Sequence, residues 1–325
     1  MPRFLHVANG TCTTRLIEAA GIGGALSIWA DPLYEGPVPG GLSDELLLDV
    51  RARYLAGASP DAAVDAANDL RRWRAVIADP DACDELVLWF EHDLFDQLNL
   101  VQLLAWLAEH VPGRVRVSLV CIGSFPGRPA FKGLGELTAP EIASLFETRT
   151  AVEDAQLRLA GRVWRAFTEP TPVALDRLRG EDTAALPFVA AALTRFLQEY
   201  PWSTDGLSRT ERRLMQVAGR GQIDLAAAFP LMHDGEDVYY VTDLSLAQLA
   251  SGLSRTTPPL LHARGGGAGT GPLQAVFELA DAGRAVLRGE ADRVALCGVS
   301  RWYGGVHLQS GGNLWRWDDK LKGIR

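Results

Sequence analysis

The sequence predicts an α/β protein: an N-terminal Rossmann-like parallel sheet with helices, then a helical linker region and a C-terminal winged-helix-like α+β domain. Three observations support this prediction. Short apolar runs alternate with helical patterns over residues 1–135, which is typical of βαβ units. Residues 136–204 show helical patterns without a strand, and residues 205–325 show three helices followed by a hairpin. We therefore expect domains at 1–135, 136–204 and 205–325, within a chain long enough for more than one core.

The first predicted strand, Phe4–Ala8, leads into the run NGTCTT at 9–14 and then into a helical pattern. A turn of this kind directs backbone N–H groups and a helix N-terminus at one point, which suits an anion. An alternative is that Thr13 or Thr14 is a plain N-cap of the helix. The candidate ligand-binding residues of this turn are Asn9, Gly10, Thr11 and Thr13.

The second predicted strand, Gly24–Ala30, ends at the polar run DPLYEGP, residues 31–37. Its Pro and Gly residues indicate a fixed turn. Asp31 and Glu35 are then either hydrogen-bond acceptors that shape the turn or ligands held on a rigid loop. Two helical patterns follow at about 43–56 and 60–78.

The third strand, Leu86–Phe90, is a continuous apolar run of the kind buried on both faces of a sheet. An amphipathic helix begins at Leu94. Three acids, a His and a Gln fall within residues 91–97, where the strand ends and the helix begins. Helix capping by Asp93 or Asp96 explains one or two of these acids. It does not explain three acids with a His and a Gln, so we predict a functional cluster here. Its members are Glu91, His92, Asp93, Asp96 and Gln97.

A fourth strand is predicted at 115–122, and strands separated by helices indicate a parallel sheet. The three polar clusters then follow strand carboxyl ends and lie on one rim. We expect a small-molecule site for a phosphate- or nucleotide-type ligand, or a hydrolase or transferase, with Mg²⁺ as the candidate cofactor. The candidate catalytic residues are Glu91, His92, Asp93, Asp31 and Glu35, the candidate ligand-binding residues include Asp96 and Gln97, and the candidate metal ligands are Asp31, Glu91 and Asp93.

The C-terminal region carries helical patterns from Ser208, at about 223–232 and at 242–254, then a hairpin whose strands flank a Gly-rich loop at 264–271. This is the order of a winged-helix domain. The third helix holds Asp243 and no cation before Arg255, and residues 205–325 hold 14 Lys and Arg against 13 Asp and Glu. Because groove binding needs cations, DNA is only weakly supported as a partner, and a packing or protein-contact role is favoured. The alternative function is thus a regulatory or adaptor protein.

The net charge and the cysteine content of the chain argue against some classes of partner and site. The net charge of −8 argues against a nonspecific nucleic-acid binder. The four cysteines stand far apart without a CxxC pair, which argues against a Cys-based zinc site and indicates a reducing compartment. We find neither a signal peptide nor an apolar run of the ~20 residues that a membrane helix needs. We therefore expect a cytoplasmic protein without a membrane partner; the oligomeric state stays open.

Several motifs resemble one bacterial family. The segments HVANG, WADPLYEGPVP, LWFEHDLFDQLNLVQLL, ELADAGRAVLRGEADRV and RWYGGVHL with WRWD together resemble the family known as domain of unknown function 1835, in its long form with a winged-helix-like C-terminal region. The resemblance covers nearly the whole chain and implies an α/β N-terminal domain, but no activity. Family members typically carry Gly-Asp-Ser or Gly-Asp-Thr after the first strand, whereas this chain has Thr11 at the position of the Asp, so a function that needed the Asp would be lost or altered.

Overall fold

The computed structural model describes residues 2–57, 59–79, 83–111, 113, 115–264 and 275–325. Contacts divide the chain into two compact units. The N-terminal unit comprises residues 1–193 with 302–307, and the C-terminal unit comprises residues 194–301 with 308–325. Helix α8 (Val189–Leu197) belongs partly to each unit.

In the described part of the N-terminal unit, five strands form one sheet with the order β2-β1-β3-β4-β5. The first four are parallel, as predicted, and β5 pairs antiparallel with β4. The prediction of an α/β fold is confirmed. The prediction that 136–204 contains no strand is wrong, because the two-residue β5 lies there. The strands are β1 (Phe4–Ala8), β2 (Ala25–Ile28), β3 (Glu85–Glu91), β4 (Arg116–Ile122) and β5 (Thr150–Ala151).

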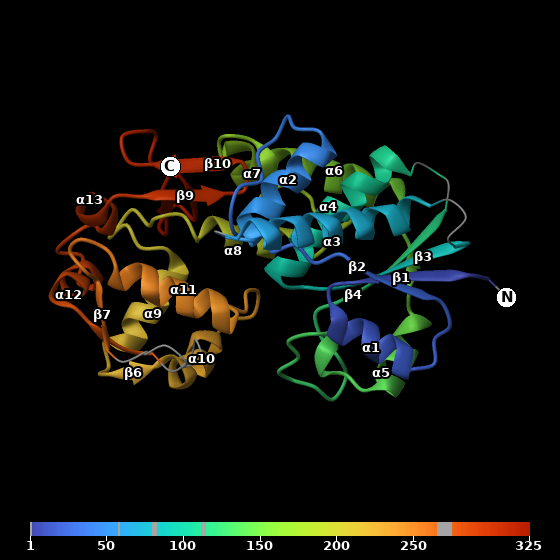
Figure 1. Ribbon diagram of the computed structural model, residues 1–325, viewed down its shortest axis with the longest axis horizontal. Helices are drawn as coiled ribbons and strands as arrows, with labels where there is room; N and C mark the ends of the chain where they lie inside the picture. Colours follow the sequence, from blue (N-terminus) through green and yellow to red (C-terminus); the bar gives the residue numbers. More distant parts are fainter. Residues whose placement is uncertain (1, 58, 80–82, 112, 114, 265–274) are drawn as a thin grey trace. The chain divides into compact units, whose positions relative to one another are not determined.

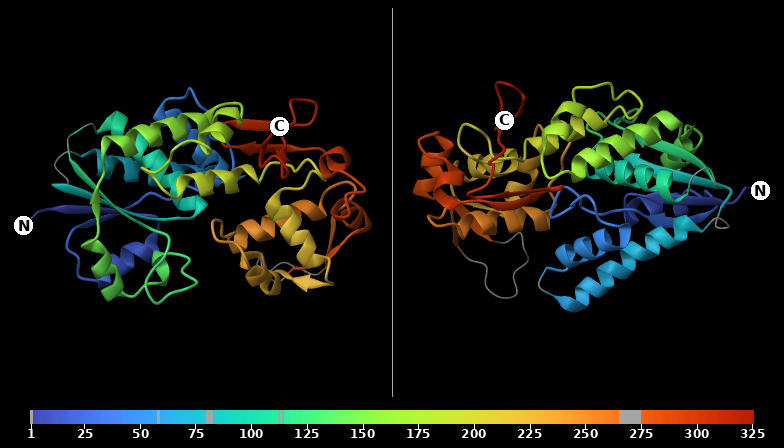
Figure 2. Two further views of the ribbon diagram at one scale, coloured as in Figure 1. Left: turned by 180° about the vertical axis from the view of Figure 1, so that it is seen from behind. Right: turned by 90° about the horizontal axis from the view of Figure 1, so that it is seen from above.

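Helices cover both faces of this sheet, as Figures 1 and 2 show. Helices α1 (Thr11–Ala19) and α5 (Ala139–Phe146) lie on one face. Helices α2 (Asp44–Leu55), α3 (Pro60–Ala78), α4 (Leu94–His110) and α6 (Asp154–Thr168) lie on the other. The short 3₁₀ helix η1 (Leu134–Glu136) precedes α5, and α7 (Val173–Leu178) follows α6. Covering both faces buries every residue of β3, which explains its uninterrupted apolar sequence.

The strand register brings two distant turns together. Ala8 pairs with Trp89 across β1 and β3, so Asn9 and Glu91 leave neighbouring strands at the same edge. The chain runs from β1 to β2 on one side and from β3 to β4 on the other. The β1–β3 boundary is therefore a topological switch point, where open α/β sheets bind ligands.

The described C-terminal unit contains a small antiparallel sheet with the order β6-β8-β7. The predicted hairpin is confirmed in β7 and β8, while residues 265–271 of the Gly-rich loop lie outside the described residues. The predicted helix at Ile223 begins at Leu225, because Ile223 pairs with Phe277 in the sheet. The elements are α9 (Arg209–Ala218), β6 (Ile223–Asp224), α10 (Leu225–His233), α11 (Asp243–Ser254), β7 (Leu261–Arg264), β8 (Val276–Leu279), α12 (Asp281–Leu287) and α13 (Arg293–Cys297).

Short strands complete the chain: β9 (Ser300–Tyr303) pairs with β10 (Val306–Gln309), and β11 (Trp317–Asp318) with β12 (Gly323–Ile324). Among the helices that the structure describes, none has the length and apolar character needed to cross a membrane.

Candidate functional site

Two carboxyl groups meet at the β1–β3 boundary, bridged by one amide. Asn9 Nδ2 donates to Glu91 Oε1 (3.0 Å) and to Asp96 Oδ2 (3.0 Å). Thr13 Oγ1 donates to Asn9 Oδ1 (2.7 Å) and thereby fixes the amide orientation. The structure thus brings together four of the residues predicted from sequence, from the β1–α1 turn, the end of β3 and the start of α4.

The Glu91 carboxyl is held from a third direction. The backbone N–H of Leu134 donates to Glu91 Oε1 (2.6 Å). A Cβ on Gly133 would overlap Glu91 Oε2, so only glycine lets the chain approach this closely. Glu91 is 6% exposed, and its position is therefore set by Asn9, Gly133 and Leu134 together.

Burial shifts the proton affinity of the cluster. Burial, with the nearby charge of Asp93, raises the pKa of Glu91 from 4.5 to about 7. Burial also raises the pKa of Asp93 to about 6. Fully buried Asp96 has a pKa well above its ordinary value, through burial and then the charges of Asp93 and Glu91. Carboxyl groups with pKa values near neutrality can both accept and donate protons at physiological pH.

Burial and the charges of Asp93 and Glu91 favour the protonated form of Asp96, whereas the hydrogen bonds that it accepts favour the ionised form. Its Oδ2 accepts from Glu91 N (2.6 Å) and from Asn9 Nδ2. Its Oδ1 is buried and has no partner among the described residues. Asp96 is thus a buried carboxyl with a raised pKa that shares the Asn9 amide with Glu91.

The remaining members of the acidic segment have mixed roles. Asp93 is the N-cap of α4, because its Oδ1 accepts from Asp96 N (2.8 Å), and it is only half-buried. Gln97 Nε2 donates to the Glu91 carbonyl (2.5 Å) and so fixes the end of β3. The His92 ring packs near those of Phe131 and Phe188, with centroids 6.4 and 6.1 Å away.

Asp31 and Glu35 have other partners. The Asp31 carboxylate accepts from Arg51 Nε (2.9 Å) and Nη2 (2.6 Å) in an ion pair whose side chains are 5% and 1% exposed. Asn99 on α4 bonds to both the N–H and the carbonyl of Asp31. Arg51 also donates to the carbonyl of Glu35 (2.6 Å). The β2–α2 loop is thus held by a buried ion pair, and the structure does not join Asp31 or Glu35 to the Glu91 cluster.

This separation bears on the predicted metal site. A buried carboxylate paired with guanidinium is already neutralised, so Asp31 is not available as a ligand beside Glu91 and Asp93. Within the residues that the structure describes, no group of three or more His, Cys, Asp or Glu side chains could hold a metal ion.

The N-terminus of α1 adjoins the bridged carboxyls. Gly10 is its N-cap, and in the described structure no side chain caps this end and no acid lies in its first turn. Thr11 is exposed at this end of the helix. Thr13 is buried, and its hydroxyl group donates to Asn9. Free N–H groups at a helix N-terminus favour an anion.

A cavity of about 260 Å³ is lined by residues that bond to the Glu91 carbonyl. Gln97 and Cys121 line it, and both bond to the Glu91 carbonyl. Phe188, which packs near His92, closes another wall. Most of the lining is apolar, which suits the uncharged part of a small ligand.

Besides Arg51, sequence reasoning missed three residues that shape these clusters: Gly133, Leu134 and Asn99. Gly133 and Leu134 lie 42 and 43 positions after Glu91, at the start of the short helix η1, and contacts of such a short element have no periodic signal. Asn99 carried a usable signal, since a polar residue inside a buried helix needs a partner.

Comparison with protein-family models and with curated proteins found no match for this chain.

Proposed function

We propose that the N-terminal unit is a Rossmann-like small-molecule site that binds a phosphate- or nucleotide-type ligand and uses Glu91 and Asp96 for acid–base chemistry in hydrolysis or group transfer. The single observation that carries this proposal is the Asn9-bridged pair of buried carboxyls at the topological switch point. Ligands of open α/β sheets bind at such points.

The roles follow from the local chemistry. With a pKa of about 7, Glu91 is suited to take a proton from an attacking hydroxyl group or water and to return it to a leaving group. Asn9 orients the Glu91 carboxyl and Asp96 holds its backbone N–H, while burial and the charge of Asp93 raise its proton affinity. The N-terminus of α1 supplies backbone donors for the anionic part of the ligand. We also propose membership of the family called domain of unknown function 1835, on the motifs quoted above.

The test is ligand-induced stabilisation of the full chain. Inorganic phosphate, AMP, ADP and ATP, each with and without Mg²⁺, should include at least one probe that raises the melting temperature, because ligands of the native state stabilise it. Gly10→Asp places a negative charge at the N-terminus of α1, where an added Cβ meets nothing within 4 Å, and should abolish this shift. Ala19→Asp adds the same charge at the exposed other end of the helix and should retain the shift. A broad panel without any shift, or equal shifts in both variants, contradicts the proposal.

A second candidate function rests on the topology of the C-terminal unit. The order α9-β6-α10-α11-β7-β8 with an antiparallel β6-β8-β7 sheet favours a winged-helix domain, and hence a regulatory or adaptor role. Helix α11 would be the recognition helix, yet it has Asp243 in its first turn, no basic residue in its last turn and an exposed Leu244. These features favour protein contact over DNA. Loss of DNA retention at low salt on changing Arg255 and Arg264 to Ala would support DNA binding, and no retention by the unchanged chain would exclude it.

A further inference from the structure

The C-terminal unit contains a second cavity, lined by arginines. Its volume is about 210 Å³, and it lies between helix α9 and the segment that joins α10 to α11. More guanidinium groups than carboxylates face it. Its charged lining residues are Arg195, Arg209, Arg212, Arg213, Asp234 and Glu236.

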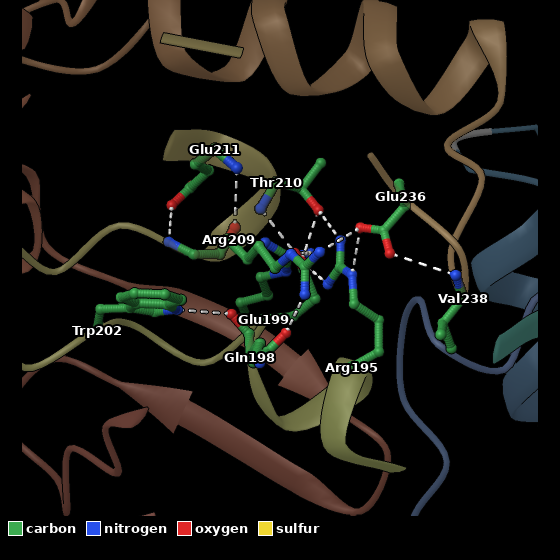
Figure 3. Close-up of polar contacts among 11 residues, drawn as sticks. Arg195, Gln198, Glu199, Trp202, Arg209, Thr210, Glu211, Glu236 and Val238 are labelled. Atoms are coloured by element: carbon green, nitrogen blue, oxygen red, sulfur yellow. Dashed lines mark hydrogen bonds and ion pairs between the residues drawn. The ribbon is translucent and has the colours of Figure 1, made fainter. Parts of the chain in front are cut away.

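The floor of the cavity is a saturated ion cluster, drawn in Figure 3. Arg195 is 4% exposed and donates to Glu199 Oε1 (2.6 Å), Glu236 Oε2 (2.8 Å) and Thr210 Oγ1 (2.9 Å). The ring of Tyr239 lies 4.7 Å from the Arg195 guanidinium. Each of the three guanidinium nitrogens of Arg195 thus has a hydrogen-bond acceptor. Arg195 therefore shapes the cavity but is too buried to contact a ligand directly.

The rim has unused donor capacity. Arg209 Nη1 donates to Gln198 (2.6 Å) and Nη2 lies 3.2 Å from Glu236, and in the described structure its Nε has no acceptor. Arg213 donates from Nε and Nη2 to the carbonyl of Leu231. Its Nη1 has no hydrogen-bond acceptor among the described residues. The two residues are four positions apart on α9, so they project from the same face of the helix.

The counter-charges at the rim are weak. The ion pair between Arg213 and Asp234 is long, at 3.5 Å, and the Asp234 side chain is 80% exposed. Arg212 is paired with Asp205, but its buried Nε has no partner in the part of the chain described. Burial and then the charge of Arg195 lower the pKa of Arg209, while the charges of nearby carboxylates oppose this shift.

We propose that this cavity binds a small oxyanion, a phosphate or a carboxylate group, through Arg209 and Arg213. Guanidinium groups bind such anions with two parallel hydrogen bonds. The cavity is smaller than the ~300–1,000 Å³ of pockets for drug-sized ligands, so it fits a small anion or the anionic end of a larger molecule. Met232 and Val241 supply apolar wall for attached carbon atoms.

The test is calorimetric titration of the full chain with inorganic phosphate, phenyl phosphate and benzoate, against sodium chloride at equal ionic strength. At least one of the oxyanions should bind where chloride does not. Arg209→Gln should weaken that binding about ten-fold or more, since a hydrogen bond to a charged group is lost. The matched control is Arg220→Gln, which removes an exposed arginine outside the cavity and should leave the affinity unchanged.

Two further variants make the result decisive. Arg209→Lys keeps the charge but loses the planar guanidinium group, so it should retain part of the affinity for the oxyanion. This variant keeps the proposal testable if Arg209→Gln lowers the stability of the protein. Titration in the Gly10→Asp background separates this cavity from the α1 site: binding that persists there and is lost with Arg209→Gln belongs to the cavity. Equal affinity in Arg209→Gln and Arg220→Gln, or no heat with any oxyanion, overturns the proposal. Competition by a DNA duplex that depends on Arg209 would assign the cavity to a nucleic-acid backbone and also overturn it.

Discussion

The most direct test of the carboxyl cluster is the substitution Glu91→Gln, followed through the pH dependence of stability. Gln has the shape of protonated Glu, and its oxygen can still accept from Asn9 and from Leu134. The variant therefore keeps the hydrogen bonds of the site and removes only the ionisation of residue 91. Any change in the pH profile then reports the proton affinity of Glu91 itself.

The magnitude follows from the raised pKa. In the folded protein the pKa of Glu91 is about 7, whereas the ordinary value is 4.5. Between these values the folded state holds a proton that the unfolded state has released, so stability falls as pH rises. At about 1.4 kcal/mol per pH unit, the loss attributable to Glu91 is about 3 kcal/mol, complete above pH 7. Below pH 4.5 both states are protonated and the contribution is fully present.

The assay is urea denaturation of the unchanged chain and of Glu91→Gln from pH 4 to 8. Across this range the free energy of unfolding should fall for both proteins, and the fall should be about 3 kcal/mol smaller for Glu91→Gln than for the unchanged chain. Asp93 and Asp96 remain and keep part of the slope. Glu18→Gln, an exposed change on α1, should follow the unchanged chain. If the Glu91→Gln and unchanged profiles run parallel, Glu91 titrates normally and our account of the site is refuted.

Three other substitutions test the surrounding framework by the same measurement. Gly133→Ala should lower the free energy of unfolding by about 1–3 kcal/mol, because its Cβ would overlap the Glu91 carboxyl. Asp31→Asn should lower it by about 3 kcal/mol, because it leaves the buried Arg51 guanidinium without its counter-charge. Glu85→Gln needs the same measurement extended down to pH 2: burial opposes ionisation of Glu85, but hydrogen bonds hold its pKa at about 2. The stability that this residue contributes is present above pH 4.5 and lost as pH falls toward 2, about 3 kcal/mol in all, and Glu85→Gln should lack this dependence.

Controls for these variants lie in the same unit. Gly23→Ala should be tolerated, since an added Cβ meets nothing within 4 Å. For Asp31, the double variant with Arg51→Met should recover part of the lost stability, because it removes the unpaired charge. If Gly133→Ala is as stable as Gly23→Ala, the backbone at 133 can move and does not fix Glu91. If the single and double variants at 31 and 51 are equally unstable, the loss comes from packing and not from charge.

Much of the sheet could be predicted from sequence because its strands are buried on both faces. The first strand was predicted at its observed bounds, Phe4–Ala8, and the β3 run is apolar throughout its centre. Strand β5 was missed because two residues, Thr150–Ala151, have no periodicity, and because its pairing with β4 is antiparallel. The start of α10 was misplaced for a similar reason, since pairing of Ile223 with β8 is a long-range choice.

The site was predicted in part for a geometric reason. Parallel strands bring their carboxyl ends to one edge, so Asn9 and Glu91 could be expected to meet. Asp31 also follows a strand at this edge of the sheet, but that position does not show which residue its carboxylate contacts. Arg51 lies 20 residues further on, inside a helical pattern where it looks like part of a solvated face. Only the folded chain shows that Arg51 is buried and that it takes up the Asp31 carboxylate.

The energetics of α4 distinguish a functional cluster from a capped helix. Capping requires one acid, and Asp93 supplies it. Glu91 and Asp96 are buried acids with raised pKa values, so at neutral pH they cost stability that Gln and Asn at the same positions would not. The other buried polar residues of α4 are amides: Gln97, Asn99 and Gln102 bond to the backbone or to Trp29 without ionisable groups. Acids at the switch point, with amides at the other buried polar positions of the helix, fit the proposed proton transfer better than they fit packing alone.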